Sequence, residues 1–262
     1  MLEQGVAVDL SFSETGAGDP LVILHGLFGS KRNWSSIAEK LGVHNRVLTV
    51  DLRNHGASPW ASRHDYPALA DDVARLIRTE IGGPAVVMGH SMGGKAAMTL
   101  ALTMPELVSR LVVVDIAPAQ SGGSSLEFLH GLKRVPLAAF TRRAEVETAL
   151  AADIPHPAIR SFLLQNLLVA PEGLSWGLNL DALEQHFTDI LGFPDIPLGH
   201  AFAGPALFIA GGRSEYGLPQ HRAEIERLFP AATIEVIDGA GHWVHAEAPG
   251  PFIETLRRFL EA

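Results

Sequence analysis

Short apolar runs rich in β-branched residues recur along this chain and are separated by stretches of helical length. Continuous apolar runs of this length are typical of strands that are buried on both faces of a sheet. Strands that alternate with helices predict a mostly parallel sheet covered by helices on both faces. Four runs lie in the first half and two near the end, at Pro20–Leu24, Arg46–Val50, Ala85–Met88, Leu111–Val114, Ala206–Ile209 and Thr233–Ile237.

Three further segments carry the periodicity of an element with one buried face. Apolar residues recur at helical spacing in Tyr66–Ile81 and in Phe252–Leu260, which predicts an amphipathic helix in each. The N-terminal segment Val6–Phe12 has an apolar residue at every second position, which predicts a half-exposed edge strand. Together these elements predict an α/β fold.

The alternation stops at residues 118–202, which contain no run typical of a buried strand. This stretch opens with the flexible Ser121–Ser125, is cut by several prolines, and carries helical apolar stripes such as that of Ile159–Leu168. Roughly 85 residues between two strands are too many for ordinary crossover helices. We therefore predict a mostly helical cap at 118–202, folded over the carboxyl ends of the strands, and a core made of 1–117 and 203–262.

Composition and charge narrow the possible partners. A chain of 262 residues fits one domain of ordinary enzyme size. Its 29 acidic and 20 basic residues give a formal net charge of −9, which argues against a nucleic acid or an anionic membrane as partner. The absence of cysteine excludes a thiol nucleophile and a cysteine-ligated zinc. No run is long enough to span a bilayer and no targeting signal is visible, so we expect a soluble cytoplasmic protein. The sequence indicates no oligomeric state.

The strongest chemical signal is the segment Gly89–Gly93, which reads Gly-His-Ser-Met-Gly. It follows a predicted buried strand and precedes the helical run Lys95–Leu102, the context in which Gly-x-Ser-x-Gly holds a nucleophile. A sharp strand-to-helix turn needs neighbours without bulky side chains, which explains the glycines. We therefore predict that Ser91 is a catalytic nucleophile rather than an incidental serine in a tight turn.

Serine is a weak nucleophile and needs a base. His242 follows the last predicted strand and precedes the closing helix. The flexible Gly239 and Gly241 would let this loop bring the ring over the serine. The rival is His245, which we expect to face solvent or cap the helix, so the sequence favours His242.

An oxyanion hole needs backbone N–H donors directed at the developing alkoxide. One donor is expected from Met92, the residue after the nucleophile. The other is expected from the glycine-rich loop that follows the first buried strand, at Leu27 first and at Phe28 second. We expect His25 to orient this loop by hydrogen bonding and not to act as a base.

The charged segment Asp51–Ser58 could pass for a second catalytic patch. A loop packed beside a site needs buried side chains that satisfy its polar backbone groups, and this interpretation is favoured. We assign no chemistry to Arg53 or His55.

With these residues identified, the chain resembles the α/β-hydrolase superfamily over nearly its full length. The elements that carry the resemblance are His25–Gly26, Asp51–Arg53, His55–Gly56, Gly89–Gly94 and Gly241–His242. Within that superfamily, three strings are similar to the small YbfF-type esterase and thioesterase group, namely Gly89–Met98, Val112–Pro118 and Trp176–Asn179. The resemblance implies an α/β-hydrolase fold, a small-molecule ester or thioester as substrate, an acyl-enzyme route and no cofactor or metal.

The chain departs from most superfamily members at the acid of the triad. The usual Gly-x-x-Asp after the strand at Ala206–Ile209 is here Gly211-Gly-Arg-Ser214, followed by Glu215. The resembling group places its acid at the end of the preceding buried strand, which is Asp115 in this chain. Asp115 is favoured on that resemblance, while Glu215, Asp238 or no acid at all stay open as alternatives.

These residues predict a serine hydrolase that cleaves carboxylic esters or thioesters through an acyl-enzyme on Ser91. The expected catalytic residues are Ser91, Asp115 and His242, with Leu27 and Met92 as oxyanion donors. Two alternatives use the same residues. The first is a cofactor-free perhydrolase or a hydrolase of carbon–carbon bonds. The second is a ligand-sensing α/β-hydrolase with little turnover. An aspartate-nucleophile dehalogenase or epoxide hydrolase is excluded, because position 91 is a serine.

Overall fold

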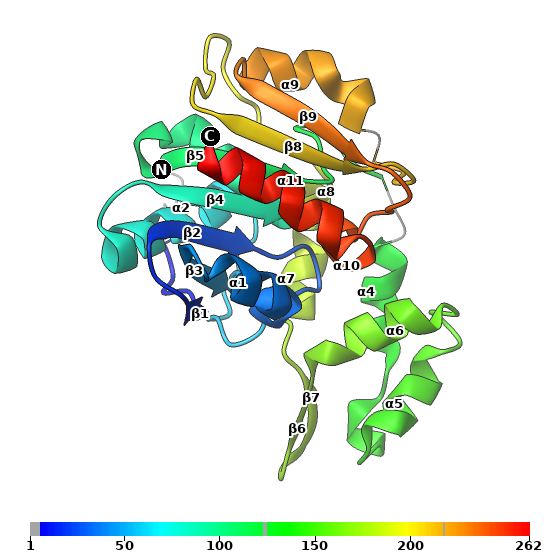
Figure 1. The fold of residues 1–262 in the computed structure, drawn as a ribbon. Coiled ribbons are helices and arrows are strands. Elements are labelled where there is room, and N and C mark those ends of the chain that lie inside the picture. Colours follow the sequence, from blue (N-terminus) through cyan, green and yellow to red (C-terminus); the bar gives the residue numbers. More distant parts are fainter. Residues whose placement is uncertain (1–5, 123–124, 217) are drawn as a thin grey trace.

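A seven-stranded sheet forms the centre of the computed structural model, which describes residues 6–122, 125–216 and 218–262 (Figure 1). The strand order is β1-β3-β2-β4-β5-β8-β9. Every neighbouring pair is parallel except β1 and β3, which are antiparallel. The strands are β1 (Phe12–Thr15), β2 (Asp19–Leu24), β3 (Asn45–Val50), β4 (Ala85–His90), β5 (Val108–Val114), β8 (Ala206–Gly211) and β9 (Ala232–Ile237).

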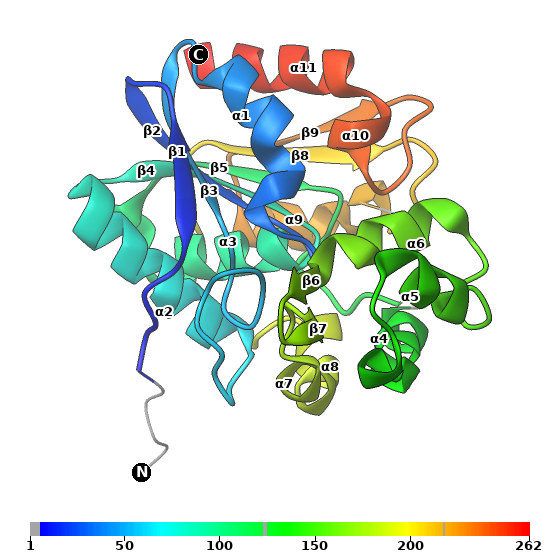
Figure 2. The ribbon, with the colours of Figure 1, turned by 90° about the horizontal axis from the view of Figure 1, so that it is seen from below.

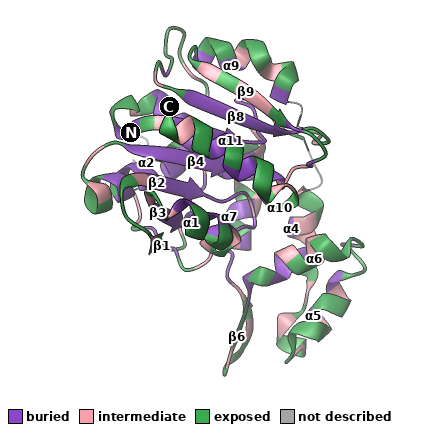
Figure 3. Ribbon diagram, in the orientation of Figure 1, coloured by how far each residue is buried: buried purple, intermediate pink, exposed green. Residues whose placement is uncertain are grey.

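Helices cover both faces of the sheet, and the core lies in the two layers between them (Figures 2 and 3). One face packs against α2 (Tyr66–Leu76), α3 (Met92–Thr103) and α9 (Arg222–Leu228). The other packs against α1 (Ser35–Leu41), α10 (Val244–Glu247) and α11 (Pro249–Glu261). Strand β4 is buried along its whole length, as its unbroken apolar run requires. The predicted α/β fold with a mostly parallel sheet is thus confirmed.

The N-terminal segment differs from its prediction. Residues 6–11 form no strand, and β1 begins only at Phe12. The backbone N–H of Val8 instead donates to Asp72 Oδ1 of α2 at 2.7 Å, and that of Ser11 donates to Ser58 Oγ at 2.8 Å. The alternating pattern reflects packing over a helix and a loop, because Leu10 is buried there although no strand pairs with it.

The described residues between β5 and β8 form five α-helices and, against expectation, a two-stranded hairpin. The hairpin joins β6 (Leu167–Ala170) to β7 (Gly173–Trp176) and projects away from the sheet (Figure 1). Its strands are only four residues long and Leu167 is their only buried residue, so they lack the buried apolar run that marks the central strands. The helices are α4 (Ser125–Arg134), α5 (Arg143–Leu150), α6 (Pro157–Leu163), α7 (Leu180–Gln185) and α8 (Phe187–Leu191).

Parallel strands bring their carboxyl ends to one edge of the sheet. His25 follows β2, Ser91 follows β4, Asp115 follows β5 and His242 follows β9, so all four lie at this edge. This is where open α/β sheets bind ligands. None of the helices in the described part of the chain is long and apolar enough to cross a membrane.

Candidate active site

Ser91 occupies a strained turn between β4 and α3. Its φ of 52° and ψ of −120° are rare for a residue with a side chain, and this conformation lifts the side chain out of the sheet. The turn requires Gly93, where a Cβ would lie 2.5 Å from the carbonyl oxygen of His25. Ser91 is held by its backbone N–H, which donates to the carbonyl of Val114 at 3.0 Å. The predicted strand-to-helix turn is therefore present, and Ser91 as the nucleophile stays a prediction.

His242 is hydrogen-bonded to Asp115, with 2.7 Å between Nδ1 and Oδ2. Asp115 is only 1% exposed and, like Ser91, has a positive φ, of 53°, directly after its strand. Its carboxylate also accepts hydrogen bonds from the Gly211 N–H at 2.8 Å and from the Ser214 hydroxyl. Because the carboxylate is an acceptor in all of these hydrogen bonds, Nδ1 is the nitrogen that donates, and in the neutral ring Nε2 is then unprotonated, as the predicted base requires.

The two other carboxylates that the sequence left open do not contact the ring. Glu215 is exposed and lines the cavity, and Asp238 is exposed at the end of β9. Ser214, at the position where most superfamily members have the acid, hydrogen-bonds Asp115 instead. The geometry therefore pairs His242 with the acid at the end of β5.

Two aromatic rings fix the orientation of His242. Tyr216 stacks on it, with ring centroids 4.1 Å apart and an interplanar angle of 20°. His90 lies on another side at 4.5 Å, and its Nε2 donates to the His242 carbonyl at 2.9 Å. Neither Tyr216 nor His90 was predicted to have a role. His90 stands beside Ser91 in the motif and could have been found there, whereas the stacking of Tyr216 depends on a loop conformation.

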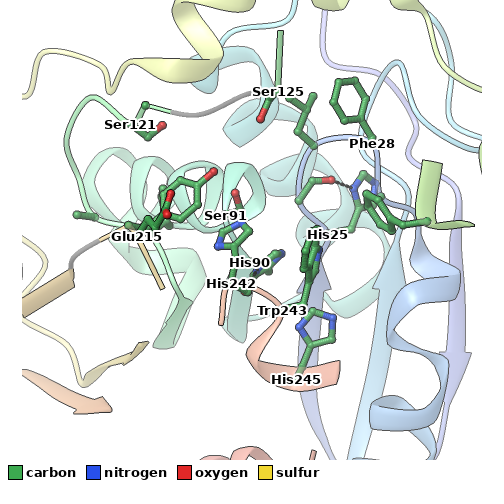
Figure 4. Close-up of a pocket in the computed structure, with 18 of the residues that line it drawn as sticks. His25, Phe28, His90, Ser91, Ser121, Ser125, Glu215, His242, Trp243 and His245 are labelled. Carbon is green, nitrogen blue, oxygen red and sulfur yellow. Dashed lines mark hydrogen bonds between the residues drawn. The ribbon is translucent and has the colours of Figure 1, made fainter. Parts of the chain in front are cut away.

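Ser91 and His242 lie side by side at the cavity (Figure 4). Among the described residues no hydrogen bond joins Ser91 Oγ to the imidazole. Hydrogen bonds of this kind are often long in the absence of substrate and tighten only in the reacting complex.

The loop after β2 forms a tight turn that offers a free backbone donor. The Gly29 N–H donates to the Gly26 carbonyl at 2.9 Å, and Phe28 within the turn has a φ of 60°. In the part of the chain that the structure describes, neither the Leu27 N–H nor the Met92 N–H donates to another protein group. Both amides are therefore available to a ligand, as the oxyanion prediction requires.

His25 holds this loop, in agreement with its predicted role. Its Nδ1 donates to the Gly26 carbonyl at 2.8 Å, and its Nε2 accepts the Leu52 N–H at 3.0 Å. Burial lowers the pKa of His25, so the ring stays neutral and keeps one donor and one acceptor. From the opposite side, Asn166 donates to the Phe28 carbonyl at 2.7 Å. Asn166 could not be found from a local pattern, because its contact with Phe28 spans 138 residues.

The expectation for His245 was wrong. The side chain is 7% exposed and stacks on Trp34 with ring centroids 4.0 Å apart. Burial lowers the pKa of His245 to about 4, and its Nδ1 has no hydrogen-bond partner among the described residues. The helix α10 is short, and its first turn faces the α1 side of the sheet rather than solvent.

The segment Asp51–Ser58 is structural, as expected. Arg53 forms a buried pair with Asp72, at 2.5 Å from Nε and 2.6 Å from Nη2. The main chain of Asp51–Ser58 binds the stretch Trp176–Asn179, since the Asn179 N–H donates to the Asn54 carbonyl at 3.0 Å. This segment thereby attaches residues 118–202 to the core.

Lys95 is a buried cation that the sequence analysis did not single out. It lies on α3, where its Nζ donates to the carbonyls of Leu191 and Gly192, both at 2.7 Å, and to Ser121 Oγ at 3.1 Å. Burial lowers the pKa of Lys95 to about 7. As the single charge in an otherwise apolar helix it could have been noticed, but its partners lie 26 to 97 residues away.

A cavity of about 470 Å³ opens over Ser91. One wall carries the apolar side chains of Phe128 on α4 and of Ile159 and Phe162 on α6. Ile116 and Leu27 contribute further apolar surface from the core. Polar groups gather elsewhere on the lining, at Gln120, Ser121, Ser125, Gln220 and His221.

Serine, acid and histidine follow one another along the chain in the order that α/β-hydrolases use. The family model described as "alpha/beta hydrolase fold" matches residues 19–249, and the chain belongs to this family.

Named relatives make the assignment more specific. The sn-1-specific diacylglycerol lipase ABHD11 of Xenopus tropicalis is 42% identical over 268 residues, which cover 97% of this chain and 83% of that protein. Esterase YbfF of Escherichia coli (strain K12) is 35% identical over 242 residues, or 92% of each chain. Among solved structures, a marine microorganism esterase superposes with a TM-score of 0.92 at 35% identity, over 97% of this chain and 100% of the other. The resemblance to YbfF-type esterases is confirmed, and the chain is a carboxylic ester hydrolase.

Proposed function

We propose that this enzyme hydrolyses carboxylic esters, and thioesters by the same chemistry, through an acyl-enzyme on Ser91. His242 acts as the base, Asp115 as the acid that orients it, and the N–H groups of Leu27 and Met92 as the oxyanion donors. The single observation that carries this proposal is the hydrogen bond of 2.7 Å between Asp115 and His242, beside a serine held in a strand-to-helix turn.

The first half-reaction forms the acyl-enzyme. As Ser91 Oγ attacks the substrate carbonyl, its proton passes to His242 Nε2, and the imidazolium is stabilised by the buried Asp115 carboxylate. The carbonyl oxygen becomes an alkoxide that the two backbone N–H groups stabilise. When the tetrahedral intermediate collapses, the bond to the alcohol or thiol breaks and the leaving group takes the proton from His242.

The second half-reaction regenerates the serine. Water gives a proton to His242 and attacks the acyl carbonyl, and the same two amides stabilise the second alkoxide. Collapse then breaks the bond to Ser91 Oγ, which recovers its proton, and the carboxylic acid leaves. No step requires a cofactor.

The acyl group binds, in this proposal, beneath residues 118–202, which act as a cap on a core made of 1–117 and 203–262. Phe128, Ile159 and Phe162 are the apolar contacts that the cap supplies. A cavity of about 470 Å³ fits a short to medium acyl chain. We propose esters with an apolar, uncharged acyl group as the substrate class. Acylglycerols belong to this class, and a relative that is 42% identical is named for one of them.

The test is the substitution Ser91→Ala in the purified enzyme, assayed with a 4-nitrophenyl ester. We expect kcat to fall at least ~10³-fold without loss of the fold, since the members of a triad act as a unit. A fluorophosphonate should label the wild type once, at Ser91, and steady release of free acid separates a hydrolase from a protein that only senses its ligand. Labelling of the alanine variant at the wild-type rate would overturn the assignment.

A further inference from the structure

One carboxylate in the cavity has no part in the proposed mechanism. Glu215 lines the cavity close to His242, yet the ring is bonded to Asp115. In Figure 4 Glu215 lies on one side of Ser91 and Phe28 on the other. A charged group at this position faces any ester that reaches the nucleophile.

The place of Glu215 is fixed by its two neighbours in the chain. The Ser214 hydroxyl donates to Asp115, and the Tyr216 ring stacks on His242 with 4.1 Å between centroids. The Tyr216 N–H also donates to Ser214 Oγ at 3.2 Å. The residue between them is therefore tied on both sides to the acid and the base of the site.

The charge of Glu215 is not neutralised by the protein. Among the described residues that line the cavity it is the only carboxylate, and none is a lysine or an arginine. No cationic nitrogen of the described chain lies within 4.0 Å of it, and the neighbouring Arg213 pairs with Glu247 instead, at 3.4 Å. The field of Glu215 also contributes to raising the pKa of Tyr216, behind burial and Asp115.

We propose that Glu215 is a specificity-determining residue that makes the cavity favour cationic esters and reject anionic ones. The proposal rests on the ester hydrolysis proposed above and adds the charge of the substrate to it. In a partly enclosed cavity, a unit charge several ångströms from Glu215 should change kcat/KM about five- to thirtyfold relative to an uncharged isostere. Monoesters of dicarboxylic acids and esters of phosphorylated alcohols belong to the rejected class, because they carry an anionic group.

The experiment uses two pairs of esters that differ in charge but hardly in shape. Butyrylcholine is compared with 3,3-dimethylbutyl butyrate, in which carbon replaces the cationic nitrogen. The monoester 4-nitrophenyl hydrogen glutarate is compared with 4-nitrophenyl 5-methylhexanoate, in which two methyl groups replace the carboxylate oxygens. The quantity measured is the ratio of kcat/KM within each pair, so that losses common to both members cancel.

We expect a wild-type ratio of at least about five in favour of the cation and a similar ratio against the anion. Glu215→Gln should bring both ratios towards one, and Glu215→Lys should invert them. The matched control is Glu254→Gln, which removes the same charge from an exposed position on α11 outside the cavity and should keep the wild-type ratios.

The outcomes separate this inference from the function on which it rests. Wild-type ratios that persist in Glu215→Gln and Glu215→Lys would overturn it, and so would equal changes in the Glu254 control, because the effect would then be one of net charge. Hydrolysis of the neutral isosteres tests the proposed function itself. If the wild type hydrolyses neither, the proposed function fails and the charge preference with it.

Discussion

The cavity has a core wall, which carries Ser91 at the carboxyl ends of the strands, and a cap wall, which consists of the lining residues on α4 and α6. The two walls are held in place in different ways. On the core wall, Ser91 and Asp115 each follow directly after a buried strand and have a positive φ, so the main chain of the sheet fixes them. On the cap wall, Phe128 stands on a helix of ten residues and Phe162 on one of seven, both largely exposed on their outer faces (Figure 3). The proposed catalytic residues are therefore positioned by the sheet. The shape of the pocket depends on the cap helices and can change without moving those residues.

Polar contacts between widely separated residues join the two walls. Asn166 donates to the Phe28 carbonyl, the Asn179 N–H donates to Asn54, and Lys95 binds carbonyls at the end of α8. These contacts satisfy buried polar groups that would otherwise be costly to leave without partners. We therefore expect changes at the core wall to lower kcat most, and changes at the contacts to have smaller and more graded effects.

The largest effect within this comparison is expected at the acid of the core wall. Asp115→Asn removes the charge that stabilises the imidazolium and can impose the wrong ring tautomer, so kcat should fall ~10²-fold or more. Glu215→Gln should change kcat for an uncharged ester less than ~10-fold, because Glu215 does not contact the ring. Steady-state kinetics on one neutral 4-nitrophenyl ester measures both, with circular dichroism as the check on folding. A crippled Glu215→Gln together with an active Asp115→Asn would reverse the assignment.

Acid should lower the stability of the core. The buried histidines lie in the core, and burial lowers the pKa of His64 to about 3 and that of His245 to about 4. The unfolded chain binds protons below about pH 6.5 while these folded rings stay neutral, so stability is lost as the pH falls from about 6.5 towards 4. Each such histidine contributes a slope of about 1.4 kcal/mol per pH unit, or tenfold in the unfolding constant. Urea unfolding at a series of pH values measures this slope.

A pair of variants assigns the slope to buried rings. His245→Phe keeps an aromatic ring on Trp34 but removes the titrating group. The free energy of unfolding should then depend less on pH between pH 6.5 and 4, by the uptake of about one proton or about 1.4 kcal/mol per pH unit. His156→Gln, at an exposed position in the cap, should leave the slope as it is. An undiminished slope in His245→Phe would show that this ring is not held neutral.

The core wall could be predicted from the sequence because its causes are local. The strand-to-helix turn at Ser91 needs small neighbours within two residues. A buried strand is recognised by an unbroken apolar run. The position of Asp115 was expected from the resemblance to a family, and the residues alone left Glu215 open. Whether Asp115 or Glu215 reaches His242 depends on the conformation of the loops after β5 and β8, and no local sequence pattern predicts that conformation.

The features that were not predicted are either strands without a buried apolar run or residues whose place depends on distant contacts. The hairpin of β6 and β7 is short and exposed, so it has no apolar run to mark it. His245 is buried because Trp34, over two hundred residues earlier, provides a stacking surface. Apolar residues alternate in Val6–Phe12 as they do in a strand, but backbone N–H groups of this segment donate to the side chains of Asp72 and Ser58 instead of to a neighbouring strand.

A smaller effect is expected where the cap contacts the oxyanion turn. Asn166 is buried and donates to the Phe28 carbonyl at 2.7 Å and to the Leu163 carbonyl at 3.1 Å. Asn166→Ala leaves both carbonyls without this donor and frees the turn that presents the Leu27 N–H. Removing an oxyanion donor outright costs about 10²- to 10³-fold, so a loosened donor should lower kcat about five- to tenfold. KM should change less, because Asn166 does not line the cavity.

The adjacent residue provides a matched control for this contact. Gln165 also joins the cap to the core nearby, since its Oε1 accepts from Asn33 Nδ2 at 2.8 Å in the short 3-10 helix that follows this turn, but this hydrogen bond is exposed to water. Water can replace an exposed partner at little cost, whereas the buried Phe28 carbonyl has no such substitute. Gln165→Ala should therefore change kcat less than about twofold. If the two variants lose kcat equally, the buried contact does not position the oxyanion donor, and the cap acts on the chemistry only by covering it.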